Sequence, residues 1–131
     1  MARQGRRLAR VPEKDEQSAI VQLLRSLGAA VYVIGHPSPN DGRSNRGTGQ
    51  TAGIPDLYVL LPTPRYGSGM ACAVWIEVKA TGGYLRVEQR LFRDRCTAVG
   101  QLHIVGGVDA VMRWLTKGGW LRRDAICVKS A

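Results

Sequence analysis

The sequence has few of the residues from which disulfide frameworks and zinc sites are built. It contains three cysteines and two histidines in 131 residues. The cysteines are odd in number, widely spaced and set in apolar stretches, with no CxxC pair, which is typical of buried thiols in a reducing compartment. A structural zinc site is disfavoured as well, because such sites use Cys and His ligands at short spacings.

A long hydrophobic run is also missing. No window reaches the roughly eighteen consecutive apolar residues that a membrane helix needs, and the charged N-terminus is not followed by an apolar stretch. We therefore expect a soluble, cytoplasmic protein that is neither secreted nor inserted into a membrane. The length suits one compact α/β domain and is too short for two.

Acidic residues are scarce relative to basic ones. Ten Asp and Glu stand against nineteen Lys and Arg, which gives a formal net charge of +9. Such a chain is drawn toward polyanions through counterion release, so nucleic acid is the natural partner. The alternative is a basic surface that serves only solubility.

Two basic segments are candidates for contact with a nucleic-acid backbone. Residues 1–11 read as a flexible basic arm, although a merely solvated terminus has the same composition. Residues 35–53 are rich in Gly, Pro, Asn and Ser, and a loop of that length in a small domain is usually functional or disordered. The arginines expected to contact nucleic acid are Arg6 and Arg7 in the arm and Arg43 and Arg46 in the loop.

Hydrophobic periodicity predicts seven elements in the order α-β-β-β-α-β-α, an α/β fold with a mixed central sheet flanked by helices. The predicted helices span residues 12–27, 86–99 and 108–117, and the predicted strands span residues 29–34, 57–61, 71–78 and 102–105. On the second helix, the predicted inward stripe is Leu85, Gln89, Phe92, Cys96 and Val99.

We assign residues 12–117 to the domain and residues 118–131 to a C-terminal extension. Trp120, Leu121, Ile126 and Val128 in this extension fit either a last strand or a dimer-facing segment, and the sequence does not choose between them.

Three charged residues sit at the ends of two apolar strands. Glu77 and Lys79 are two residues apart and so point to the same face at the end of one strand. Asp56 follows Pro55 directly before the other strand. Taken separately, these residues fit a solvated ion pair and an ordinary Pro-Asp turn. If the two strands are antiparallel neighbours, however, the two carboxylates and the ammonium converge.

Such a group suits phosphodiester hydrolysis. Mg²⁺ or Mn²⁺ prefers oxygen ligands, and Asp56, Glu77 and the backbone carbonyl of Val78 can provide them. Lys79 would then orient the attacking water or offset charge on the phosphate in the transition state.

Two helical residues are candidates to complete the site. Gln89 interrupts an apolar stripe and needs a partner, for which Lys79 or the attacking water are candidates. Glu16 lies on the buried side of the first helix and is a possible outer metal ligand or water holder. A structural glutamine and a capping or solvated Glu16 are the alternatives, and Glu13 competes for the same role.

The ordered motifs resemble the VRR-Nuc branch of the PD-(D/E)xK nucleases. They are Glu16 on a first helix, Gly53-Ile-Pro-Asp-Leu57, Trp75-Ile-Glu-Val-Lys79, and Leu85 with Gln89. The resemblance spans about residues 16–115. It implies a restriction-endonuclease-like fold and divalent-metal cleavage of DNA. It also implies that Asp56 and Glu77 are ligands, that Lys79 is catalytic, and that Gln89 and Glu16 are accessory residues.

Short stand-alone members of this family, often from phages, resemble Holliday junction resolvases that act as homodimers. The resemblance therefore implies a homodimeric, structure-selective endonuclease. Two alternatives stay open at this point: a non-catalytic nucleic-acid-binding module on a nuclease fold, and an RNA-directed nuclease.

Overall fold

The computed structural model describes residues 11–34 and 52–123, which form three helices and four strands. The helices are α1 (Glu13–Ser26), α2 (Val87–Val99) and α3 (Val108–Gly118), and the strands are β1 (Ala30–Val33), β2 (Leu57–Leu61), β3 (Cys72–Val78) and β4 (Leu102–Gly106). The predicted order α-β-β-β-α-β-α is confirmed, and the predicted bounds differ only at the element ends.

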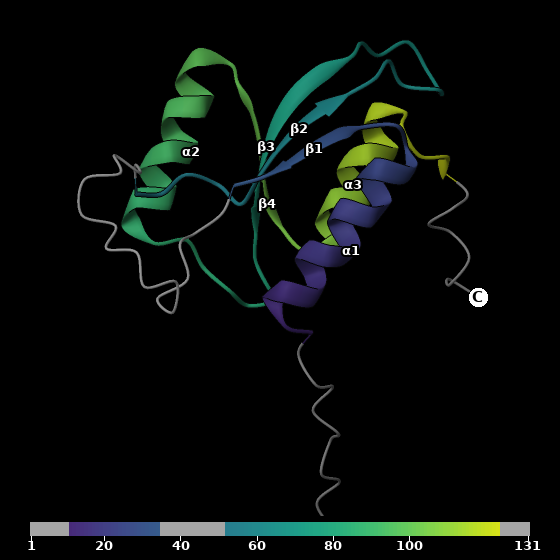
Figure 1. Ribbon diagram of the computed structural model, residues 1–131. Helices are drawn as coiled ribbons and strands as arrows, with labels where there is room; N and C mark the ends of the chain where they lie inside the picture. The colour runs from purple at the N-terminus through teal and green to yellow at the C-terminus, as the bar shows by residue number, and fades with distance from the viewer. Residues whose placement is uncertain (1–10, 35–51, 124–131) are drawn as a thin grey trace, which may run out of the picture.

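The four strands form one mixed sheet in the order β1-β2-β3-β4. β1 pairs with β2, and β2 with β3, in antiparallel orientation, whereas β3 and β4 are parallel. The parallel pair requires a crossover, and α2 provides it. Figure 1 shows α2 on one side of the sheet and the pair α1 and α3 on the other.

The core lies between the sheet and the α1–α3 pair. Alternate residues of β2 and β3 point to this side, and their apolar side chains are almost completely buried. Ile20 and Leu24 of α1 and Val111 and Leu115 of α3 cover them and are themselves fully buried. The apolar stripe of each helix thus packs against the apolar side chains of alternate strand residues. This packing determines which face of the sheet is buried.

The opposite face of the sheet is only partly covered. Phe92 of α2 packs edge-on against Trp75 of β3, with ring centroids 5.3 Å apart, and lies 6.1 Å from His103 of β4. Leu60 of β2, on the part of this face nearer β1, is 41 % exposed. The prediction that Val99 continues the inward stripe of α2 is wrong, because at the last turn of the helix its side chain is 80 % exposed.

The first residues after α3 pack against the core as irregular chain. Trp120 is 8 % exposed and stacks on Trp114 at a centroid distance of 5.1 Å. Its indole Nε1 donates a hydrogen bond of 2.7 Å to the carbonyl of Pro62. Trp120 and Leu121 belong to no strand. Ile126 and Val128 lie outside the described residues.

Two expectations from composition can be compared with the described segments. Cys72 and Cys96 are free thiols, and Cys96 is buried, whereas Cys127 lies outside the described residues. Within residues 11–34 and 52–123, every helix is too short or too polar to cross a membrane.

Candidate metal-binding active site

Glu77 is a buried carboxylate at the end of β3. It lies two residues after Trp75, so its side chain points to the face of the sheet that α2 covers. Its exposed fraction is 2 %, and no other charged residue in the described part of the chain is buried. A carboxylate this deep is costly unless it is protonated, hydrogen-bonded or bound to a cation.

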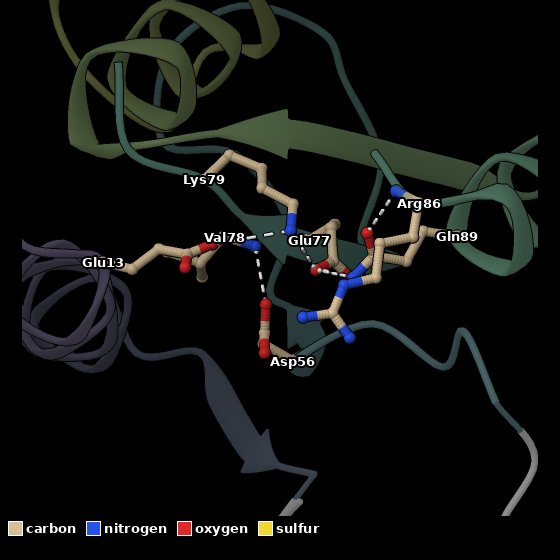
Figure 2. Close-up of polar contacts among 7 residues, drawn as sticks. All are labelled: Glu13, Asp56, Glu77, Val78, Lys79, Arg86 and Gln89. Carbon is tan, nitrogen blue, oxygen red and sulfur yellow. Dashed lines mark hydrogen bonds and ion pairs between the residues drawn. The ribbon is translucent and has the colours of Figure 1, made fainter. Parts of the chain in front are cut away.

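Asp56 lies beside Glu77 on the neighbouring strand. Leu57 is paired with Ile76, so in the antiparallel register the next pair along is Asp56 and Glu77. Oδ2 of Asp56 accepts a hydrogen bond of 2.9 Å from the backbone N–H of Val78 (Figure 2). The structure therefore brings the two carboxylates together. From the sequence alone, their proximity depended on the two strands being antiparallel neighbours.

Gly53 holds the segment that carries Asp56 close to the start of α2. Its φ is +88°, and a Cβ at this position would collide with the backbone carbonyl of Glu88. We predict that Gly53→Ala destabilises the protein by about 2 kcal/mol or more and slows any Asp56-dependent reaction, because the segment must move away from α2.

Thermal denaturation and cleavage assays check this prediction, and Gly67→Ala is the matched control. Gly67 has a similar φ of +82°, but a Cβ added there would meet nothing within 4 Å. The control thus carries the backbone strain without the collision. Equal destabilisation of both variants would contradict the close approach of Gly53 to α2.

Val78 and Lys79 continue the site along the same strand end. The N–H and C=O of a strand residue point to the same side, so the Val78 carbonyl faces the β2 side, where its N–H meets Asp56. Nζ of Lys79 lies 3.6 Å from Oε1 of Glu77, and the Lys79 side chain is 15 % exposed. One carbonyl and one ammonium are thus added to the two carboxylates.

Gln89 connects this group to α2. Its Nε2 donates a hydrogen bond of 2.9 Å to Oε1 of Glu77, and its Oε1 accepts one of 2.8 Å from the backbone N–H of Arg86 (Figure 2). The predicted partner of Gln89 was Lys79 or a water, and the structure shows the carboxylate of Glu77 instead. Both ends of the amide are used, which fixes its orientation at the first turn of α2.

The two glutamates of α1 take different positions. Oε2 of Glu16 accepts a hydrogen bond of 2.7 Å from the backbone N–H of Val108, so this side chain caps α3. Oε1 of Glu13 instead lies 3.6 Å from Nζ of Lys79. Of the two competitors on α1, Glu13 is therefore the one in contact with the lysine, while Glu16 makes a capping contact.

The environment of Glu77 favours its neutral form when no cation is bound. Burial raises the pKa of Glu77 to about 8, with the charge of Asp56 acting in the same direction and Lys79 in the opposite one. Two carboxylates and one ammonium leave the group one negative charge in excess when all are ionised. A strongly perturbed carboxyl of this kind is typical of functional sites.

The residues present fit a divalent cation that keeps several waters. Within the part of the chain that the structure describes, Oε2 of Glu77 is buried without a hydrogen-bond partner. No group of three or more His, Cys, Asp and Glu side chains is arranged to hold a metal among these residues. Two carboxylates with one carbonyl suit Mg²⁺ or Mn²⁺, which need not be enclosed by protein ligands.

All four predicted nucleic-acid contacts fall outside the described residues: Arg6, Arg7, Arg43 and Arg46. Arg86, in contrast, was not predicted from the sequence. Figure 2 shows its side chain reaching from the start of α2 across Gln89 toward the site. The signal for it was present in the sequence, since Arg86, Arg90 and Arg93 recur at helical spacing.

The comparison with solved structures returns the fold that the sequence resembled. A structure described as a VRR_NUC domain matches with a TM-score of 0.56 and 24 % sequence identity, over 80 % of this chain and 94 % of that one. No family model and no curated protein matches the sequence. The chain therefore has the fold of a VRR_NUC domain, a nuclease-type fold.

Proposed function

We propose that this chain, with the fold of a VRR_NUC domain, is a nuclease that uses Mg²⁺ or Mn²⁺ to hydrolyse phosphodiester bonds in DNA. The observation that carries the proposal is the buried carboxylate of Glu77. One of its oxygens has no partner among the described residues, and Asp56 and Lys79 lie next to it. A cation at this place would satisfy the free oxygen and offset the excess negative charge.

Each residue of the site then has a role set by its position. Asp56, Glu77 and the carbonyl of Val78 would hold the metal, which when bound polarises the phosphate and makes water more acidic. Lys79 would offset negative charge that builds up on the phosphate, and it can hold the attacking water by a hydrogen bond. Gln89 holds Oε1 of Glu77 by a hydrogen bond, and Oε2 is left without a hydrogen-bond partner among the described residues.

Glu13 and Glu16 have indirect roles in this proposal. Glu13 contacts the ammonium of Lys79 at the same 3.6 Å distance as Glu77 does, and so helps to hold it. Glu16 anchors α1 to the start of α3 and so keeps Glu13 in place, as a positioning residue. An outer-ligand role for Glu16 would require it to give up its bond to Val108.

Asp56→Asn tests the proposal on a panel of DNA structures. We expect Mg²⁺- or Mn²⁺-dependent cutting by the native protein and none by this variant, because the amide is a poor metal ligand. Its Oδ1 can still accept the hydrogen bond from Val78, so the fold should survive, as circular dichroism would check. Metal-independent binding that is equal in both proteins, with no cutting in either, would favour a binding module instead.

Structure selectivity and homodimer formation are the finer part of the proposal. Their support is the resemblance of the motifs to junction-resolving members of the family, and the net charge of +9 favours DNA as the bound polymer. The panel should therefore compare a four-way junction, a flap, a nicked duplex, a linear duplex and an RNA strand of the same sequence. Faster cutting of the branched forms would support selectivity, and equal rates on linear duplex would exclude it.

A further inference from the structure

An exposed tyrosine and a row of arginines lie beside the candidate metal site. Tyr84 is 85 % exposed and stands between Lys79 at the end of β3 and the start of α2. Arg86, Arg90 and Arg93 are exposed and follow one another at intervals of four and three residues, so they share one side of α2. We call Tyr84 and these three arginines the α2 arginine face.

The α2 arginine face lines a hollow near the candidate metal site. The hollow has a volume of about 720 Å³ and is lined by residues 84–88 together with Arg90 and Arg93. One of its lining residues, Arg86, is linked to Glu77 through Gln89, which bonds to the backbone N–H of Arg86 and to the carboxylate. The hollow is therefore within reach of a polymer that is held at Glu77.

The charges around the hollow are mainly positive. Glu88 also lines it, and Arg93 makes an exposed ion pair of 3.4 Å with its neighbour Asp94. Exposed pairs of this kind are weak, so the guanidinium remains able to bind another anion. An exposed aromatic ring next to a basic groove is the combination that binds single strands, in which phosphates meet the cations and bases stack on the ring.

We infer that the α2 arginine face holds an unpaired strand of the substrate next to the scissile phosphate, with Tyr84 stacked on a base. The identity of the polymer rests on the proposed function. Bases inside an intact duplex are already stacked on one another and leave no face for Tyr84. The substrate class assigned by this surface is therefore DNA with a single-stranded segment directly beside the cleavage point.

A second copy of the chain is a poorer occupant of the same surface. Contact with a second copy at this surface would bury three arginines without neutralising them, whereas a phosphate backbone would neutralise all three. Measuring the molar mass of each variant by light scattering separates the two occupants.

Binding of labelled strands in EDTA tests the inference without any cleavage. The probes are an oligo-dT strand, a strand of the same length in which abasic residues replace the thymidines, and a blunt duplex. Tyr84→Ala should bind the dT strand about fivefold or more weakly, with the other two probes unaffected, and Tyr84→Phe should restore binding. An equal loss on the abasic strand, or a changed molar mass, would overturn the inference.

The arginines are tested by Arg90→Gln with Arg93→Gln. Loss of two phosphate contacts should lower the slope of log K against log salt for the dT strand by about 1.4, since each contact contributes about 0.7. Arg95→Gln is the matched control, because Arg95 is exposed on the other side of the same helix. Equal slopes for both variants would overturn the inference. Loss of cutting in Asp56→Asn is measured separately, so failure of either proposal is recognisable by itself.

Discussion

Glu77→Gln is expected to abolish metal-dependent cleavage and, in the same protein, to raise the stability of the metal-free state. The amide is a poor ligand for Mg²⁺, so the rate should fall by about 10³-fold or more. Its Oε1 can still accept the hydrogen bond that Gln89 gives to Glu77. The buried position then holds a neutral group of the same shape in place of a carboxylate that is costly to ionise.

The stability gain should depend on pH in a defined direction. The pKa of Glu77 is raised from its ordinary value of 4.5 to about 8, so the folded protein binds one more proton than the unfolded chain between these values. The metal-free native protein should therefore lose stability as the pH rises from about 4.5 to 8. The variant lacks this titration and should be more stable at pH 8, on the order of 3 kcal/mol.

Chemical denaturation in EDTA at pH 5 and pH 8 measures this difference. Asp15→Asn is the control, because Asp15 is an exposed acid of α1 and should show no comparable pH-dependent gain. Added Mg²⁺ should stabilise the native protein and leave Glu77→Gln unchanged. A variant that is less stable than the native protein at pH 8 would show that Glu77 is held by interactions that favour its charged form.

Lys79→Met is expected to lose cleavage without losing the metal. Methionine keeps most of the apolar stem and removes the ammonium that lies 3.6 Å from Oε1 of Glu77. Single-turnover cleavage at saturating Mg²⁺ should slow by about 10²- to 10³-fold, because a charge aimed at the transition state is gone. Mn²⁺ should bind as tightly as before or more tightly, since a competing positive charge has been removed.

The control for this prediction is Lys14→Met, which removes an exposed lysine of α1. It should leave the single-turnover rate unchanged. If high Mg²⁺ restores the full rate of Lys79→Met, the lysine acts only on metal binding and the transition-state role is wrong.

The arrangement of the sheet was predictable from the sequence because the strand patterns leave few alternative pairings. β2 and β3 are near-continuous apolar runs separated by a Pro- and Gly-rich turn, which favours neighbouring antiparallel strands. That pairing alone places Asp56 opposite Glu77. The prediction was weaker at the end of α2, because helical periodicity does not show where the sheet beneath a helix stops. Val99 is the example.

The partners of the helical site residues were harder to predict. Glu13 and Glu16 are three residues apart and share a side of α1, so spacing cannot tell which one reaches Lys79. The packing of α1 against α3 determines which glutamate contacts the lysine, because Glu16 accepts a hydrogen bond from the N–H of Val108 at the start of α3. Gln89 was correctly singled out as a polar residue in an apolar stripe. The partner of Gln89 depended on the exact position of α2 relative to β3, which the sequence does not give.

The most direct test of the account is the position of Mn²⁺ in crystals of the native protein, located by anomalous scattering. We predict a peak between the carboxylates of Asp56 and Glu77, on the side of the Val78 carbonyl, and its absence in crystals of Glu77→Gln. A protein that cuts DNA with Mn²⁺ but binds the ion elsewhere, with these carboxylates free of metal, would contradict the assignment of the site.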